Sequence, residues 1–209
     1  MNLMAESTLS SVRRKLDKHE WARKIAAQLE HDGNKFVSTK LELPVGPGEH
    51  DQEYYCSDCG TFLYLDPSRP HEHKCVFCGK IFRGAQYDSV WQNRIHTMVS
   101  VDARRASYSY LLSPSPGLFR ALRDYLIFYT KRYKSGFPEQ GPEYSRGKVT
   151  TTGLTEAMWV LNLLWVYHSI EEGLGPEERT SLRDELFVPV ALLLAPQATI
   201  IHNIHTWYM

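Results

Sequence analysis

Four cysteines carry the clearest chemistry in the sequence. They form two C-x2-C pairs with fifteen residues between the pairs, and they are Cys56, Cys59, Cys75 and Cys78. A C-x2-C turn brings two sulfurs to one side of the chain, and two such turns supply the four ligands of a tetrahedral zinc site. Thiolates suit the borderline-soft zinc ion, and four of them leave no open coordination position. We therefore expect these cysteines to bind a structural zinc ion.

Two other uses of the cysteines are a disulfide framework and unrelated buried thiols. Disulfides are typical of secreted chains, and residues 1–15 contain no apolar segment of a secretory signal. His71 and His73 lie between the two pairs, and either could replace a cysteine as a ligand. Because four cysteines already complete the ligand set, we expect both histidines to lie around the site or in solvent.

The segment around the cysteines predicts the element that positions them. A short aromatic and apolar run at 61–65 suits a small hairpin. Gly60 and Gly79 each follow the second cysteine of a pair, where a tight turn often needs a positive φ angle. We therefore predict a zinc ribbon over residues 51–87.

The rest of the chain has the apolar periodicity of helices. The first predicted helix is 9–32, with Gly33 as its stop and a linker rich in proline and glycine over 33–50. Further helices are predicted at 88–112, 117–134, 152–172 and 176–194.

Two of these helices have a distinctive composition. The helix at 152–172 is apolar almost all round, which predicts burial among other helices, and its narrow polar stripe is formed by Thr155, Asn162 and Ser169. Pro189 should kink the last helix. The predicted fold class is therefore mainly α, with helical hairpins and a small inserted β ribbon.

The composition of the chain limits the classes of partner that it is expected to bind. The chain has 209 residues and is 43% hydrophobic, and its 24 basic and 24 acidic residues give zero net charge. This balance argues against a nucleic-acid or anionic-membrane binder. No stretch approaches the roughly 18–20 apolar residues that span a membrane. With no secretory signal in view, a cytoplasmic location is the expectation.

Several segments in order resemble the heparinase II/III-like proteins. Members of that family often carry such a ribbon, followed by a Gly-x-x-Tyr-Asp-x-x-Trp segment. The matching segments here are Tyr54–Gly60, Cys75–Phe82, Gly84–Trp91, Ala103–Ser113, Ala121–Tyr133 and Gly147–Trp159. The resemblance implies a lyase that cleaves acidic polysaccharide by β-elimination beside a uronic acid. It also implies that residues 88–209 form the first part of an (α/α) toroid, after an N-terminal helix and linker at 1–50 and the ribbon at 51–87.

The last residues resemble a catalytic segment of that family. Alginate-lyase-like relatives read Asn-His-Gly-Thr-Trp-Tyr where this chain reads 203–208 as Asn-Ile-His-Thr-Trp-Tyr. Asn203 matches, and the family's asparagine contacts the substrate carboxylate. Ile204 stands where those relatives have the His, and His205 stands where they have the Gly. We take His205 as the second catalytic candidate. His202 and Trp207 are the candidates for substrate binding.

The resemblance also implies more toroid helices and a β-sandwich with a catalytic Tyr and His. We therefore expect this chain to be the N-terminal part of a longer enzyme, and to be inactive alone. Two other classes stay open. One is a zinc-ribbon adaptor with a helical scaffold and no catalysis. The other is a toroid glycosidase, which needs a carboxylate pair that the sequence does not obviously supply.

Overall fold

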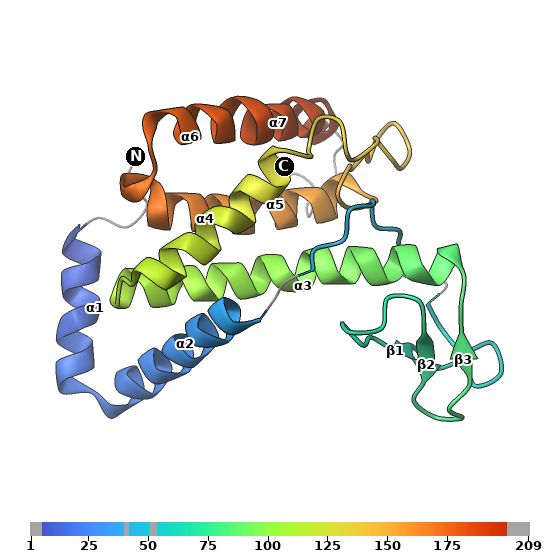
Figure 1. The fold of residues 1–209 in the computed structure, drawn as a ribbon, viewed down its shortest axis with the longest axis horizontal. Helices are drawn as coiled ribbons and strands as arrows, with labels where there is room; N and C mark the ends of the chain where they lie inside the picture. The colour runs from blue at the N-terminus through green and yellow to red at the C-terminus, as the bar shows by residue number, and fades with distance from the viewer. Residues whose placement is uncertain (1–5, 40–41, 51–53, 200–209) are drawn as a thin grey trace. The chain divides into compact units, whose positions relative to one another are not determined.

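The computed structural model describes residues 6–39, 42–50 and 54–199 of the chain. Most of the described residues are helical, and a three-stranded sheet is inserted between the second and third helices (Figure 1). This confirms the predicted mainly α class with a small β element. No helix in the described part combines the length and the apolar character that crossing a membrane requires.

The described chain forms two compact units. The helical unit contains α1 (Glu6–Lys18), α2 (Glu20–Ser38), Ser100–Lys131 and Val160–Phe187, and the ribbon unit contains Glu42–Val99, Arg132–Trp159 and the segment from Val188 onward. The long helices α3 (Ala85–Leu112) and α5 (Gly153–Ile170) each contribute residues to both units.

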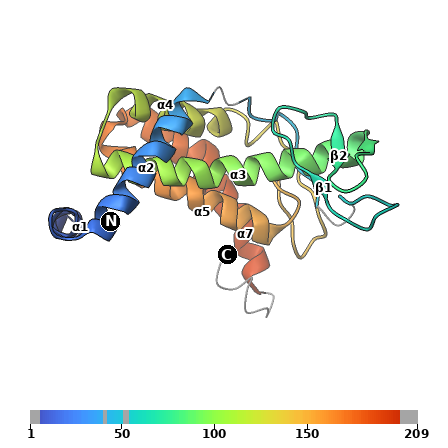
Figure 2. The same ribbon diagram turned by 90° about the horizontal axis from the view of Figure 1, so that it is seen from below.

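In the helical unit, α2 packs on α4 (Pro116–Thr130; Figure 2). Ser115 caps α4 by accepting a hydrogen bond from the Leu118 N–H, and Pro116 follows it with a φ angle suited to the first turn. The ring of Phe36 on α2 meets Tyr125 edge-on, with 6.0 Å between the ring centroids. Leu118, Leu122, Tyr125, Leu126 and Tyr129 are buried along one face of α4, as the periodicity predicts.

The prediction of one helix over 9–32 is wrong at both its middle and its end. His19 is extended between α1 and α2, and the Arg23 guanidinium donates to the carbonyls of Leu16 and Asp17, which end α1. Gly33 does not stop α2, which continues to Ser38. A Cβ atom on Gly33 would lie 2.6 Å from Ser109 Oγ, so this glycine allows close helix packing.

Two features of the later helices also differ from expectation. Met158 and Leu161 are exposed on α5, because no described element covers that side. Asn162 is buried and donates to the Ser100 hydroxyl at 2.9 Å.

Around the expected kink, the chain forms α6 (Pro176–Ser181), a π-helical segment (Leu182–Phe187) and α7 (Val188–Leu194). The widened π turn accommodates Pro189, which has no N–H to donate.

The small sheet holds three strands in the order of the chain. These are β1 (Leu63–Tyr64), β2 (His73–Cys75) and β3 (Ile81–Phe82), all antiparallel. The register places Leu63 opposite Cys75 and Tyr64 opposite Lys74. It also places Lys74 opposite Ile81.

Short 3-10 turns at Glu171–Gly173 and Ala195–Thr199 complete the described elements.

Candidate metal centre

Each C-x2-C pair sits in a tight turn that is closed by a glycine. The Gly60 N–H donates to the Cys56 carbonyl at 2.8 Å, and the Gly79 N–H donates to the Cys75 carbonyl at 3.1 Å. The φ angles of Gly60 and Gly79 are 64° and 75°. A Cβ atom at Gly60 would meet nothing within 4 Å, so backbone conformation rather than space requires the glycine there.

The two turns bring all four sulfurs together. The Sγ atoms of Cys56, Cys59, Cys75 and Cys78 lie within 4.8 Å of one another. All four residues are free thiols, and the sulfurs of Cys56 and Cys78 are 3.8 Å apart. Four sulfurs at about 2.3 Å from a zinc ion in a tetrahedron lie about 3.8 Å from each other. The cluster can therefore hold a metal ion with this geometry.

Nearby donors favour the thiolate form at one position. The Thr61 hydroxyl lies 3.5 Å from the Cys75 sulfur, and the N–H groups of Phe77 and Cys78 donate to the same sulfur at 3.4 and 3.5 Å. These hydrogen bonds, with that of Thr61 the strongest, lower the pKa of Cys75 to about 6. The neighbouring Cys78 sulfur raises the pKa of Cys59 to about 12. Four thiolates at such distances need a cation to offset their mutual repulsion.

A buried hydrogen-bond chain joins the ribbon to the start of α3. The Tyr54 hydroxyl lies 2.8 Å from His73 Nδ1, and His73 Nε2 lies 2.9 Å from a carboxylate oxygen of Asp88. His71, which is exposed, contacts the other Asp88 oxygen at 2.7 Å. Neither histidine belongs to the sulfur cluster. His71 is exposed as expected, whereas His73 is fully buried and has both ring nitrogens engaged.

Burial and neighbouring polar groups shift the pKa values of these hydrogen-bonded residues in opposite directions. Burial raises the pKa of Tyr54 to about 12, although the Arg94 guanidinium stacked 5.2 Å from its ring centroid opposes the shift. Burial also disfavours the Asp88 carboxylate, but hydrogen bonds from His73 and His71 outweigh it and lower the pKa of Asp88. The arrangement therefore holds Asp88 ionised and fixes the His73 ring between two partners.

A second buried cluster lies at the N-terminus of α5. The Glu156 carboxylate is fully buried and accepts hydrogen bonds from the Tyr133 hydroxyl, the Thr150 N–H and the Thr150 hydroxyl at 2.8–2.9 Å. The Val149 N–H donates to it at 3.3 Å. Burial nevertheless raises the pKa of Glu156. This carboxyl fastens the loop at 149–150 to the first turn of α5.

Sequence reasoning missed both buried clusters. Tyr54, Asp88, Tyr133 and Glu156 have no spacing that marks them as a group, because their partners are distant in sequence. The one available signal was a glutamate in an otherwise apolar helix. The four catalytic and substrate-binding candidates, His202, Asn203, His205 and Trp207, lie outside the described residues.

The comparison with curated proteins gives a partial match. The chain is 29% identical over 109 residues to the exo-oligoalginate lyase of Saccharophagus degradans. The match covers 50% of this chain but 15% of that enzyme, so the chain spans a small part of the length of this relative. No protein-family model matches the chain. The chain is thus similar to part of an alginate lyase.

Proposed function

We propose that this chain provides the ribbon and first toroid helices of an enzyme that cleaves acidic polysaccharide by β-elimination. The similarity to an exo-oligoalginate lyase over 109 residues carries the proposal. The resemblance of the chain to heparinase II/III-like proteins agrees with it. The substrate class is then a uronic-acid polymer or oligosaccharide.

The reaction requires removal of the C5 proton of a uronate. A base takes this proton, the electron pair forms a double bond between C4 and C5, and the bond from C4 to the leaving oxygen breaks. An acid then protonates that oxygen. Charge moves into the C5 carboxylate as the proton leaves, so a donor to that carboxylate stabilises the transition state. We assign this donor to the Asn203 side-chain amide and assign His205 to proton transfer or a second substrate contact, with His202 and Trp207 binding the substrate.

In this proposal the four cysteines bind zinc, and the metal has a structural role. Four thiolates fill a tetrahedral zinc site, so no position remains for a water or a substrate. The ion offsets the charge of the cluster and fastens the two turns. The chemistry belongs to the helical part of the enzyme.

The test measures the ultraviolet absorbance of the unsaturated uronate product, using the complete product of the gene on alginate and glycosaminoglycans. Asn203→Ala should reduce turnover by about a hundredfold or more, because one transition-state donor is lost. Asn34→Ala is the matched control, since Asn34 is exposed on α2, and it should leave turnover unchanged. A stable Asn203→Ala protein with full activity would remove the assignment, and absence of elimination on every substrate would refute the lyase proposal.

One observation favours a second candidate, a binding module without catalysis. Six large apolar side chains are exposed on the ribbon, and such surfaces mark interaction sites. They are Tyr55, Phe62, Tyr64, Val76, Phe77 and Ile81. The turnover measurement separates the two candidates, because a module of this kind forms no unsaturated product.

A further inference from the structure

The solvent face of the ribbon sheet is unusually apolar. An antiparallel sheet that packs one face on a core normally carries polar residues on the other. Here the cross-strand register sets Tyr64, Lys74 and Ile81 in one row over the three strands. Tyr64 is 56% exposed and Ile81 is 41% exposed, and Val76, two residues beyond Lys74, is 67% exposed.

The opposite face of the same sheet already supplies the ribbon's core. Leu63, His73 and Cys75 alternate with the exposed residues and are buried. Leu63 and Cys75 pack with Tyr54 and Val90 in one cluster, and His73 hydrogen-bonds to Tyr54. The exposed aromatic and aliphatic residues on the other face lie outside this core and are available to a ligand.

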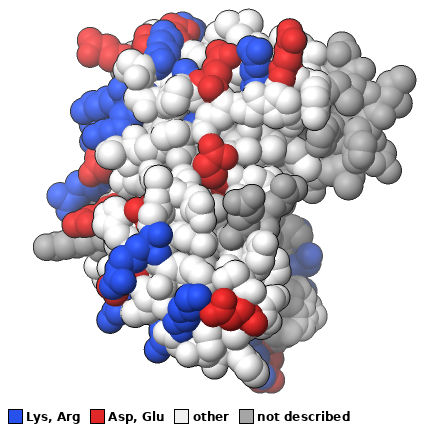
Figure 3. All heavy atoms as spheres, turned by 90° about the vertical axis from the view of Figure 1, so that its right-hand side faces the viewer, with Lys and Arg blue, Asp and Glu red and all other residues white. Residues whose placement is uncertain are grey.

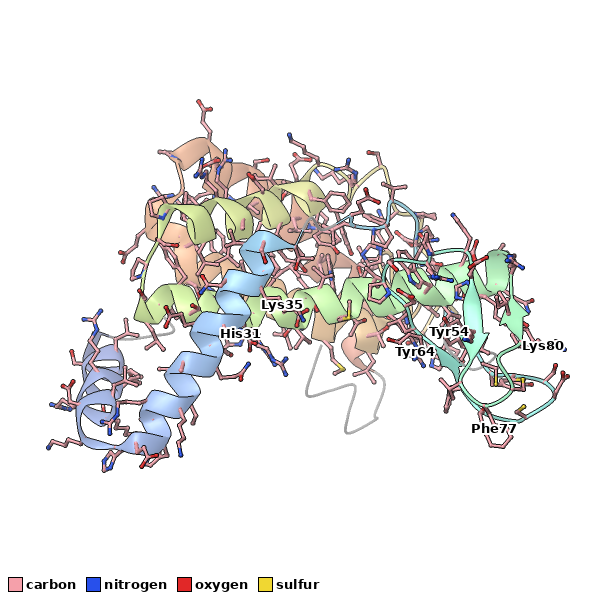
Figure 4. All side chains as sticks on the ribbon, turned by 60° about the horizontal axis from the view of Figure 1, so that its bottom comes forward. His31, Lys35, Tyr54, Tyr64, Phe77 and Lys80 are labelled. Carbon is pink, nitrogen blue, oxygen red and sulfur yellow. The ribbon has the colours of Figure 1, made fainter. Side chains whose placement is uncertain are left out.

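A cavity of about 440 Å³ opens on this face. Tyr64, Val76 and Ile81 form its apolar part, and charged groups from the loop after β1 form its rim. Arg69 pairs with Asp66 at 3.6 Å and with Glu72 at 3.2 Å. Lys74 also lines the cavity, and no ion-pair partner contacts it among the described residues. Figure 4 shows Tyr64 on the ribbon, with Phe77 and Lys80 near the turn of the second C-x2-C pair.

We propose that this face binds one uronate unit of an acidic oligosaccharide, outside the catalytic centre. The Tyr64 ring offers a flat apolar surface for the C–H face of a sugar. Lys74 supplies the single positive charge that a sugar carboxylate requires. The Arg69 guanidinium and the carboxylates of Asp66 and Glu72 provide donors and acceptors for sugar hydroxyls. The substrate class in this inference rests on the proposed function.

The charge pattern favours this ligand over a nucleic acid or a protein. A nucleic-acid surface neutralises several phosphates with unpaired cations. In this cavity Arg69 pairs with Asp66 and Glu72, and Glu72 also pairs with Arg83. Within the described part of the chain, Lys74 is left as one unpaired cation lining the cavity, which matches a single sugar carboxylate. Figure 3 shows one face of the molecule, on which basic and acidic groups are interspersed with uncharged surface. The centre of a protein interface is depleted of charged residues, but here four of them line the hollow.

The experiment is affinity electrophoresis of the metal-loaded 209-residue chain in gels that contain alginate or the neutral polysaccharide dextran. Alginate should retard the chain and dextran should not, and added salt should weaken the retardation. Tyr64→Ala and Lys74→Glu should each raise the apparent Kd at least about fivefold, the equivalent of one lost aromatic or charged contact. Tyr144→Ala and Lys131→Glu are the matched controls, because both residues are exposed and neither lines this cavity.

Zinc content and urea unfolding, measured on every variant, confirm that the ribbon stays folded. Retardation that survives both Tyr64→Ala and Lys74→Glu would overturn the proposal, as would equal retardation by dextran. Tight binding of single-stranded DNA with the same dependence on Tyr64 and Lys74 would also overturn it. The binding assay is independent of turnover. Alginate binding by the 209-residue chain, together with no elimination by the complete product of the gene, refutes the lyase proposal and leaves this site intact, whereas elimination by the complete product without Tyr64-dependent binding does the reverse.

Discussion

Asp88 is expected to fasten the ribbon to α3, and Asp88→Ala should destabilise the ribbon unit by about 1–5 kcal/mol. The substitution leaves the Nε2–H of the buried His73 without an acceptor, which costs about 1–3 kcal/mol. The exposed contact with His71 adds less than about 1 kcal/mol. Loss of an acidic residue from the first turn of α3 adds about 0.3–1 kcal/mol.

The measurement is the free energy of unfolding of the metal-loaded chain in urea, followed by tyrosine and tryptophan fluorescence. Asp58→Ala is the control, because its ion pair with Lys80 is exposed and should contribute little. The pKa of Asp88 is lower in the folded state than its ordinary value of 3.8. The stability from Asp88 is therefore present above pH 3.8 and is lost as the pH falls through the folded pKa. The reasoning fails if Asp88→Ala unfolds like Asp58→Ala, or if its deficit persists unchanged in strong acid.

The remaining predictions concern the metal and the buried glutamate. Elemental analysis of the wild-type chain should find about one zinc per chain. Cys56→Ser combined with Cys75→Ser should abolish this zinc and should expose the amides of 54–84 to hydrogen exchange; a metal-free wild-type chain with two disulfides would contradict the prediction. Glu156→Gln should flatten the pH dependence of unfolding. Burial raises the folded pKa of Glu156 above 4.5, so its stabilising contribution is full below that pH and is lost as the pH rises through the folded pKa. Glu143→Gln, at an exposed position, should keep the wild-type slope, and an equal slope in both variants would exclude this role for Glu156.

The parts of the fold that depend on local pattern were predictable. The helices at 88–112 and 117–134 match α3 and α4 closely, because apolar spacing along one helix is readable without knowing its neighbours. The gathering of the four cysteines was equally predictable, since each C-x2-C turn is a local structure. Gly60 and Gly79 have the positive φ angles that such turns need.

The errors arose where a distant residue decides the local structure. Arg23 ends α1 by reaching back to carbonyls six and seven residues earlier, and periodicity contains no trace of that contact. The link from His73 to Asp88 joins a strand to a helix fifteen residues later. An ionisable residue can therefore hold a fold together while its sequence neighbourhood looks ordinary. The catalytic assignment of Asn203 stays a prediction, since it falls outside the described residues.

Gly33 has no side chain, and a side chain there would compete with that of Ser109 for the same space. A Cβ atom at residue 33 would come within 2.6 Å of the Ser109 hydroxyl and 3.4 Å of a Leu118 methyl. The close approach of α2 to α3 and α4 therefore depends on the absence of a side chain at this position. Residues 33 and 109 should therefore change together during evolution, with any gain in size at one matched by a loss at the other. Among homologous sequences, an alanine at 33 should occur with a glycine at 109, because the Cβ atom of residue 109 would itself lie 2.9 Å from the new Cβ atom. A single enlarging substitution should be rare, even though both residues are small and neither takes part in chemistry.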